Sequence, residues 1–564
     1  MPKSSTPATW ELESFQLSQS TAYVIGWLFV PGERINGLSL QLRTPENGGK
    51  EILVGRIVLD AGKPRPDVYQ VHQAHPEALE SGFVGLGAWP RQPRHGDRLV
   101  LSASLGNGES ISIEIPSARW HWSLCPTAWQ QRTAAIRQLL RYGKRALRLL
   151  VSGQIASLRE KLTRQLGEMP QKSLPPRLTE DDLVSLGANQ GTSCNLIIDH
   201  RLGGGANHYR MDEVKRWLKQ GNTVFTLTYH LARLQPMLIV ETRTQQLRFG
   251  LEKASDLLPT LSAVPLSTIT YNTAVSFVGA EEIPELVLRL KQQHQARLTV
   301  LLHDYFSICP SHFLINANGE FCNIPDLESC RRCLPNNRHG FTSLFQGDVA
   351  QWRAAWGPML QQADEIIAFS HSSIELLKRA YRSKPGEPVV IREETITVQP
   401  HSVDYIDRES LIIKNRDQLI IGIVGQIGFH KGAAFIQALA QEIEQQGAKE
   451  RIAVIGSLEG RCNPAIVRQS GPYRREDLAR TILESGANIM LFPSIWPETF
   501  SYVTQEIIQF DLPLACFSYG APAERVKQYE KGLVLESQDP SDVLESLRQL
   551  FQVSYHMSAS AQDT

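Results

Sequence analysis

The sequence predicts a multidomain chain in which an all-β sandwich and a helical linker precede two doubly wound, Rossmann-like α/β halves. Three observations predict this fold class. The chain has 564 residues, several times the roughly 100 to 200 residues of one domain. Its first part is rich in short strand-like runs and turns, whereas strand-like and helix-like segments alternate in its second part. The predicted units are residues 1–122, 123–190, 191–403 and 404–564.

The composition is that of a globular protein. Hydrophobic residues make up 42% and charged residues 21% of the chain, which excludes a fibrous or mostly disordered protein. Lys+Arg and Asp+Glu number 58 each, so no overall positive field predicts a nucleic-acid partner. No apolar run approaches the roughly 20 residues of a membrane span, and the start, Met1–Trp10, is polar. We therefore expect a cytoplasmic protein.

Strand-like runs separated by Pro-Gly, Asn-Gly-Gly and Gly-Asn-Gly turns occupy the region from Phe15 to Ile115. Their number and spacing predict a sandwich of about seven strands. The clearest runs are Tyr23–Val30, Leu38–Leu42, Ile52–Leu59, Leu99–Ser104 and Ile111–Ile115.

The segment from Ala128 to Glu168 combines apolar residues at helical spacing with a large excess of Arg and Lys. This pattern predicts a basic amphipathic helix, or a pair interrupted at Gly143 and Gly153. Two interpretations stay open: peripheral contact with the inner face of the cytoplasmic membrane, or packing between domains with the basic face in water. Leu174–Pro176 then predicts a linker.

Alternating strands and helices after residue 190 predict two parallel sheets covered on both faces and joined near Asp404–Gln418. In the first half, strands are expected at Cys194–Asp199, Thr223–Tyr229, Ser267–Val278, Arg297–His303 and Glu365–Ser370, and helices from Ala206, over Glu282–His294 and near Ser372. In the second half, strands are expected at Leu419–Val424, Arg451–Ile455, Ile489–Phe492 and Leu514–Phe517, and helices after Gly432, near Glu476–Glu484, after Thr499 and near Ser541–Phe551. The last helix packs either on its own half or back on the first.

The most informative segment is Phe492–Glu506, in which a strand ends in a proline-bounded loop before a helix. Thr499 or Ser501 can cap this helix. Glu498 then lies at the helix entrance and Glu506 about two turns further on. Free amides at such an entrance attract a phosphate, and carboxylates accept hydrogen bonds from sugar or ribose hydroxyls.

With its surroundings, this segment resembles the signature of retaining GT-B glycosyltransferases of the GT4 family (bacterial glycosyltransferase group 1), a pair of glutamates separated by seven residues. Other motifs occur in the order that the family shows, and together they cover about Cys194 to Phe551. They are Leu202–Ala206, His303–Phe306, Pro400–Asp404, Val424–Gly432, Gly520–Arg525 and Lys531–Val534.

The resemblance implies a glycosyltransferase that moves a sugar from a UDP- or GDP-linked donor to a hydroxyl of a glycan or lipid-linked acceptor in bacterial surface polysaccharide synthesis. It implies no metal ion for catalysis, because protein groups such as the Lys431 ammonium hold the diphosphate. The catalytic residues that it implies are His303 and Glu498. The donor-binding residues are Gly204, Gly205, Gly425, Lys431, Glu498, Thr499, Phe500, Ser501 and Glu506.

Two positions depart from the family pattern. Gln426 stands where many relatives have an arginine, and Ser501 stands where a glycine is frequent. Two alternatives therefore stay open: a sugar-nucleotide epimerase of the same fold, and a non-catalytic glycan-binding or scaffold protein. In the first region, Arg65–Val68 with Ser81–Phe83 resembles small β domains appended to some bacterial glycosyltransferases. That region is either a carbohydrate-binding or docking module, or a structural or oligomerising one.

Four of the eight cysteines fall within 25 residues, at positions Cys309, Cys322, Cys330 and Cys333. Four thiols that end in Cys-x-x-Cys can close a tetrahedral zinc site. The spacing is not that of a standard two-knuckle site. The cysteines are therefore either structural zinc ligands or reduced thiols that pack a loop beside the acceptor cleft.

Overall fold

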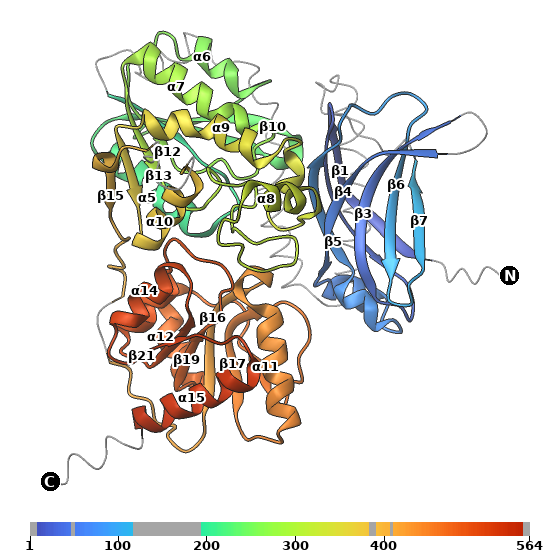
Figure 1. Ribbon diagram of the computed structural model, residues 1–564, viewed down its shortest axis with the longest axis vertical. Coiled ribbons are helices and arrows are strands. Elements are labelled where there is room, and N and C mark those ends of the chain that lie inside the picture. Colours follow the sequence, from blue (N-terminus) through green and yellow to red (C-terminus); the bar gives the residue numbers. More distant parts are fainter. Residues whose placement is uncertain (1–7, 47–50, 117–192, 383–390, 407–409, 556–564) are drawn as a thin grey trace.

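The computed structural model describes residues 8–46, 51–116, 193–382, 391–406 and 410–555, which form three sheets (Figure 1). The predicted basic helix at 128–168 and the linker at 174–176 lie outside the described residues. No helix in the described part of the chain has both the length and the apolar character that crossing a membrane requires.

The first sheet has seven antiparallel strands, in the order β1-β2-β5-β4-β3-β6-β7. They are β1 Thr9–Ser18, β2 Thr21–Phe29, β3 Ile35–Pro45, β4 Glu51–Lys63, β5 Gly82–Ala88, β6 Arg98–Leu105 and β7 Ser110–Ile115. The long strand β4 pairs with both β3 and β5 and so joins the two parts of the sheet. Leu38, Leu40 and Leu42 of β3 alternate with polar residues and enter one apolar cluster, as the period of a strand requires.

Two short helices, α1 (Pro66–Val71) and η1 (Pro76–Glu80), connect β4 to β5. The Arg65 guanidinium forms ion pairs with Glu13 at 2.8 Å and with Asp67 at 2.9 Å. The Arg65–Val68 motif therefore ties α1 to strand β1. The Ser81–Phe83 motif forms the start of β5.

The second sheet has eight strands, in the order β11-β10-β9-β8-β12-β13-β14-β15. The strands are β8 Cys194–Ile198, β9 Thr223–His230, β10 Gln235–Glu241, β11 Gln246–Gly250, β12 Leu266–Tyr271, β13 Arg297–Leu301, β14 Glu365–Ala368 and β15 Ile396–Val398. Strands β10 and β11 run antiparallel at one edge, which the expectation of a purely parallel sheet missed. We call this sheet and its helices the N-terminal half.

The strand expected over 267–278 ends at Tyr271. After Tyr271 the chain turns toward β8, because the amides of Asn272 and Thr273 both donate to the carbonyl of Ile198. Ser276 then takes a left-handed conformation with φ of 78°. The helices of this half are α5 Gly204–Lys219, α6 Leu257–Thr260, α7 Ile283–His294, α8 Leu327–Cys333, α9 Val349–Gln361 and α10 His371–Ala380.

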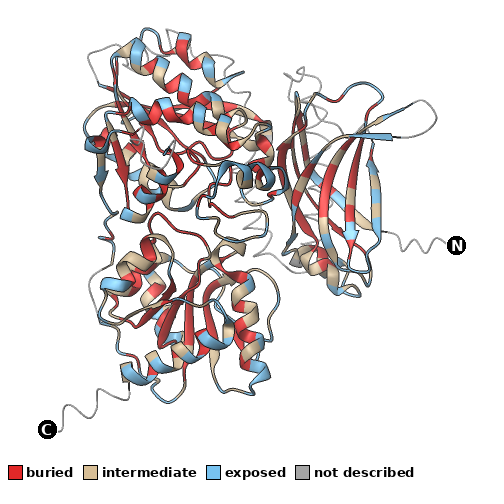
Figure 2. Ribbon diagram, viewed as in Figure 1, coloured by how far each residue is buried: buried red, intermediate tan, exposed pale blue. Residues whose placement is uncertain are grey.

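The third sheet is parallel throughout, in the order β18-β17-β16-β19-β20-β21. In chain order this is 3-2-1-4-5-6, the doubly wound arrangement of nucleotide-binding sheets. The strands are β16 Ile420–Ile427, β17 Arg451–Leu458, β18 Val467–Gln469, β19 Ile489–Phe492, β20 Leu514–Phe517 and β21 Gly532–Leu535. The helices are α11 Ala433–Gln445, α12 Leu478–Ser485, α13 Tyr502–Gln509, α14 Gly520–Gln528 and α15 Pro540–Tyr555. We call this unit the C-terminal half, and Figure 2 shows its central strands buried between exposed helix faces.

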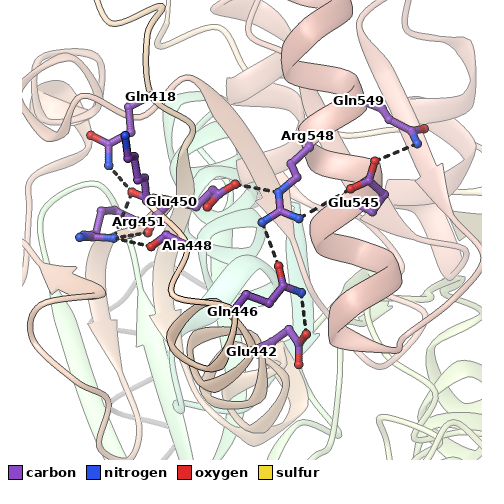
Figure 3. Close-up of polar contacts among 10 residues, drawn as sticks. Gln418, Glu442, Gln446, Ala448, Glu450, Arg451, Glu545, Arg548 and Gln549 are labelled. Carbon is purple, nitrogen blue, oxygen red and sulfur yellow. Dashed lines mark hydrogen bonds and ion pairs between the residues drawn. The ribbon is translucent and has the colours of Figure 1, made fainter.

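Over its described residues, Pro540–Tyr555, the last helix α15 packs on its own half. Its apolar face, with Leu544 and Leu547, enters the same cluster as α11. On its polar side, the Arg548 guanidinium donates to Glu450 at 2.7 Å and to Gln446 at 3.0 Å (Figure 3). A mixed apolar and charged contact therefore holds the helix against α11.

The first sheet contacts both halves (Figure 1). On the N-terminal half, the Ser343 hydroxyl donates to the carbonyl of Leu86 at 2.7 Å. On the C-terminal half, Lys63 forms an ion pair with Glu459 at 2.7 Å. The β region thus spans the junction between the two halves.

Candidate functional site

The turn after β16 places Lys431 beside the loop that follows β19. Gly425 has φ of 123° and Gly432 has φ of 86°, both in the region that favours glycine. A Cβ atom at Gly432 would lie 2.1 Å from the carbonyl oxygen of Pro493. Only glycine lets the two loops approach this closely, so the turn that carries Lys431 rests against the Pro493–Glu498 loop.

Glu498 is buried in that loop. The Ser494 hydroxyl lies 3.2 Å from Glu498 Oε1 and 3.4 Å from the carbonyl oxygen of His430, and so links the carboxylate to the Lys431 turn. Burial raises the pKa of Glu498, while Lys431 and the Ser494 hydrogen bond act in the opposite direction. The carboxylate is therefore held close to a cation at the carboxyl ends of two neighbouring strands.

Residues Thr499, Phe500 and Ser501 connect this loop to helix α13. The Ser501 hydroxyl caps the helix by accepting from the Thr504 amide at 3.2 Å. The Thr499 hydroxyl donates to the carbonyl of His303 in the N-terminal half at 2.8 Å. The Arg525 guanidinium lies over the Phe500 ring, 3.8 Å from its centroid.

Glu506 is buried further along the same helix. Its Oε1 atom accepts from the Tyr405 hydroxyl at 2.5 Å and lies 3.6 Å from Arg475 Nε. Burial raises the pKa of Glu506, and Tyr405 and Arg475 oppose that shift. Both contacts use Oε1, so Oε2 keeps no partner among the described residues and can accept a hydrogen bond from a ligand.

The N-terminal half contributes the start of α5. Gly203 and Gly204 have φ of 87° and 83°, and the helix begins at Gly204 without a side-chain cap. A Cβ atom at Gly205 would lie 3.2 Å from the Tyr502 ring at the start of α13. The amino ends of α5 and α13 therefore lie near each other, one from each half. Such ends favour an anion.

His303 lies among aromatic rings at the end of β13. Its imidazole stacks on Phe369 at 4.4 Å and on His401 at 5.3 Å, and Tyr209 meets it edge-on at 5.1 Å. Burial, and then His401 and His200, place the pKa of His303 well below its usual range. Its Nε2 atom is buried and has no hydrogen-bond partner in the described part of the chain. The imidazole is thus neutral, and its Nε2 atom is unpartnered within the described residues.

The two halves touch directly around these residues. The Tyr305 hydroxyl donates to the carbonyl of Pro497 at 2.7 Å. The Glu524 carboxylate accepts from the first amides of α10, those of His371 and Ser372. The Pro497–Thr499 segment, next to Glu498, therefore meets the N-terminal half at His303 and Tyr305, whereas Gly425 lies in strand β16 and Glu506 lies inside helix α13.

Sequence reasoning missed four residues at the junction: Tyr405, Arg475, His401 as a ring partner of His303, and Arg525 over Phe500. His401 belongs to the Pro400–Asp404 motif and Arg525 to the Gly520–Arg525 motif, but the resemblance implied no role for either residue. Two tyrosines flank Arg475 in space, with its guanidinium carbon 4.3 Å from the Tyr405 ring centroid. Tyr405 and Tyr502 are far from Arg475 in the sequence, so no local signal pointed to this group.

The structure does not support a zinc site at the cysteine cluster. Cys309, Cys322, Cys330 and Cys333 are free thiols, and within the described residues no group of three or more His, Cys, Asp or Glu side chains is arranged to hold a metal ion. The zinc hypothesis is therefore not supported. Cys309 and Cys322 pack against the main core of the N-terminal half, and burial raises the pKa of Cys322 to about 11.

No curated protein matches the chain. Similar solved structures include Alr3699/HepE of Anabaena in complex with UDP-glucose (13% identity, 64% of this chain and 90% of that chain, TM-score 0.39). They also include starch synthase IV from Arabidopsis thaliana bound to ADP and acarbose (9%, 65% and 92%, 0.39). A third is WaaG, a glycosyltransferase involved in lipopolysaccharide biosynthesis (15%, 64% and 90%, 0.37).

One family model matches part of the chain. Residues 407–558, which include the Lys431 turn and both glutamates, match the model of the glycosyl transferases group 1. The C-terminal half is therefore similar to the glycosyl transferases group 1.

Proposed function

We propose that the chain is a retaining glycosyltransferase that moves a sugar from a UDP- or GDP-linked donor to a hydroxyl of a glycan acceptor in polysaccharide synthesis. The observation that carries the proposal is that Lys431 and Glu498 lie together on the loops after β16 and β19 of the matched region, where Thr499, next to Glu498, bonds the carbonyl of His303. A cation, two carboxylates and a neutral imidazole are groups that a nucleotide sugar needs around it.

The donor diphosphate binds between the Lys431 ammonium and the amino ends of α11 and α13. Negative charge develops on the diphosphate as its bond to the sugar breaks, so a fixed cation and backbone amides stabilise the transition state. Gly425, Gly204 and Gly205 let the backbone approach the ligand. Among the described residues, Lys431 forms no ion pair, which leaves its charge for the phosphate.

The two glutamates divide the remaining parts of the donor. Glu498 lies beside Lys431 and accepts hydrogen bonds from hydroxyls of the transferred sugar. Glu506, two turns along α13, accepts from a ribose hydroxyl through Oε2. Thr499, Phe500 and Ser501 hold the loop between them, and His303 contacts the sugar from the N-terminal half.

In the reaction, the acceptor oxygen forms a bond to the anomeric carbon on the face that the leaving diphosphate vacates. The bond from that carbon to the diphosphate breaks, and its electron pair goes to the diphosphate oxygen. The proton of the acceptor hydroxyl goes to the same leaving phosphate. The configuration at the anomeric carbon is retained, and no covalent glycosyl-enzyme is needed.

Donor binding and product analysis test the proposal. A panel of UDP- and GDP-sugars is screened by thermal shift, because a ligand that binds the folded state raises the melting temperature. The best donor is then incubated with and without sugar acceptors, and the anomeric configuration of the product is read by NMR. A new α-linked product from an α-linked donor is expected.

The matched variants are Glu506→Gln and Glu484→Gln, the second on α12 of the same half. Glu506→Gln is expected to raise the donor KM, because an amide replaces the accepting carboxylate oxygen, and Glu484→Gln is expected to leave it unchanged. A changed sugar nucleotide without any acceptor would indicate an epimerase instead. Nucleotide binding without turnover of any kind would indicate a non-catalytic scaffold.

We further propose that residues 191–403 form the acceptor side, that residues 404–564 form the donor side, and that residues 1–122 are an accessory module. The separate apolar clusters of the first sheet and of the C-terminal half support this division.

A further inference from the structure

A groove of about 300 Å³ lies between the first sheet and the N-terminal half, away from the donor residues. One wall is the face of strands β3, β4, β6 and β7 that points away from their own apolar core. The other wall comes from the N-terminal half, where Ala317, Asn336 and Arg338 line the groove. A volume of this size is in the range of small-ligand sites.

The sheet wall is rich in hydroxyl groups because of its register. Ser39 of β3 pairs directly with Ser102 of β6, and Ser104 of β6 pairs with Ser110 of β7. All four serines line the groove. They share one face because residues two apart on a strand point the same way. Two short rows of hydroxyls result. Ser39 and Ser104 donate to the carbonyls of Ser102 and Gly37, and the hydroxyl oxygens in both rows can accept from sugar hydroxyls.

Gln41 and Gly37 shape the same wall. The side-chain oxygen of Gln41, Oε1, accepts from the Arg43 guanidinium at 2.7 and 3.0 Å. Its side-chain nitrogen, Nε2, donates along the wall to the Ser39 hydroxyl at 3.4 Å. A Cβ atom at Gly37 would lie 2.9 Å from Ser104 Oγ. The glycine therefore keeps open the space above the second row.

The charge of the groove is positive. Arg56 and Arg338 both line it, whereas none of the lining residues is acidic. Within the described ranges neither arginine forms an ion pair. Two free guanidiniums that face one space can bind carboxylates, which they hold in a bidentate geometry.

The wall formed by the N-terminal half also contacts the donor turn. Ala317 belongs to a tight turn closed by the bridge between Ile315 and Phe321. A Cβ atom at Gly319 in the same turn would lie 2.8 Å from the Phe429 ring, and His339, next to Arg338, stacks on that ring at 4.5 Å. Phe429 begins the turn that ends at Lys431. The groove and the donor turn therefore share one packed segment.

We propose that this groove binds an acidic oligosaccharide, with its sugar carboxylates on Arg56 and Arg338 and its hydroxyls on the serine rows. The binding itself does not depend on the reaction. The further step, that the bound chain is the acceptor glycan and extends toward the donor turn, rests on the proposed function.

Calorimetric titration of the full chain tests the binding. The probes are oligogalacturonate, a maltooligosaccharide of the same length and inorganic phosphate at matched ionic strength. Oligogalacturonate is expected to bind, and the double variant Arg56→Gln/Arg338→Gln is expected to weaken it by about tenfold or more. The matched control is Arg289→Gln/Arg468→Gln, which removes the same charge from exposed arginines outside the groove and is expected to leave the affinity unchanged.

A second variant tests the hydroxyl wall without changing the charge. Ser104→Ile places a residue that favours strands into the groove and is expected to weaken binding while it preserves the melting temperature. Equal affinity for the acidic and neutral oligosaccharides would overturn the proposal. So would phosphate binding as tight as that of oligogalacturonate, which would show a simple anion site, or equal losses in the groove and control variants.

The outcomes for the groove and for the proposed function are separable. Release of nucleotide from the donor by water, with no acceptor present, measures the donor site alone and is expected to stay unchanged in the groove variants. Loss of oligosaccharide binding with intact donor turnover supports the groove. A protein that binds oligogalacturonate through Arg56 and Arg338 but turns over no donor would refute the proposed function and leave the groove proposal standing.

Discussion

The two α/β halves share an architecture but present different chemistry to their junction. The C-terminal half brings charged groups, namely Lys431, Glu498, Glu506 and Arg475, and it pairs its carboxylates with donors. The N-terminal half brings rings, with His303 stacked on Phe369 and Tyr209 edge-on to it. Under the proposed function, the charged side would face the charged donor and the side with rings would face the neutral hydroxyl of the acceptor.

The difference follows from the cost of burying charge. An unpaired charge in an apolar site costs several kcal/mol, so the C-terminal half supplies Ser494, Tyr405 and Arg475 as partners. The N-terminal half avoids the cost, because burial holds His303 and His401 in their neutral form and lowers the pKa of His401 to about 3. Changes on the charged side should therefore affect donor turnover, and changes on the ring side should affect the acceptor or the sugar.

The largest effect is expected at Lys431. Lys431→Met removes the charge that stabilises the leaving diphosphate, and it should lower kcat/KM for the donor by about 100- to 1000-fold. Its melting temperature should stay close to that of the wild type, because the side chain forms no ion pair in the part of the chain that the structure describes. The exposed Lys449→Met is the control for loss of a lysine on the same half. Unchanged kcat and KM in Lys431→Met would remove Lys431 from the site.

A smaller effect is expected at His303. His303→Gln removes one hydrogen-bonding imidazole and should lower turnover by about five- to tenfold, the value of a hydrogen bond of about 1 kcal/mol. Because the pKa of His303 lies well below 6.5, the ring stays neutral from pH 6 to 8. The ratio of the variant rate to the wild-type rate should therefore be constant over that range. A ratio that changes with a midpoint near pH 6.5 would show that His303 titrates and that the burial argument is wrong.

Removing residues 1–122 should have a still smaller effect on donor binding at the junction of the two halves. The first sheet has its own apolar cluster, so both halves should fold without it and bind the donor. Leu86 is also packed in the core of the N-terminal half, so we expect a melting temperature lower by a few degrees. Lys63→Gln in the full chain separates the two contacts, because it removes the ion pairs of Lys63 with Glu459 and Asp60 and leaves the contact with the N-terminal half in place. An insoluble truncation that binds no nucleotide would show that the sheet belongs to the catalytic body.

Most strands could be predicted because a strand buried in a parallel sheet reads as a short apolar run. The prediction failed where an apolar run continues past the end of the strand. Ala274, Val275 and Phe277 are as buried as strand residues but follow the end of β12, so an apolar run alone extended the strand too far. Strands β10 and β11 were themselves missed, because no strand was predicted between Tyr229 and Ser267, and their antiparallel direction was missed with them.

The site shows the same limit. The two glutamates were found because their spacing is local to one loop and helix. Tyr405 lies 101 residues from its partner Glu506, and only the fold brings the two together. The groove was missed for the same reason. Ser39 of β3 and Ser102 of β6, which pair across the sheet, are 63 residues apart in the sequence.

The smallest expected effect is the contribution of one histidine of the N-terminal half, His312, to the pH dependence of stability. Burial, and then His430 and His200, lower the pKa of the buried His312 to about 3, whereas a histidine in an unfolded chain titrates near 6.5. Below pH 6.5 the unfolded state therefore binds one more proton at this position. As the pH falls, the free energy of unfolding should decrease by up to about 1.4 kcal/mol per pH unit for such a histidine.

Buried carboxyl groups act in the opposite direction. Burial raises the pKa of Asp199 and of Asp304 to about 6, so below that value the folded state binds the extra proton and part of the histidine effect is cancelled. Comparing variants removes this shared contribution. Melting temperatures at pH 7 and 5.5 should differ less in His312→Gln than in the wild type, while the exposed control His95→Gln should follow the wild type. An equal fall in all three proteins would mean that His312 is protonated as readily in the folded chain as in the unfolded one, and that this ring is not part of a neutral interior.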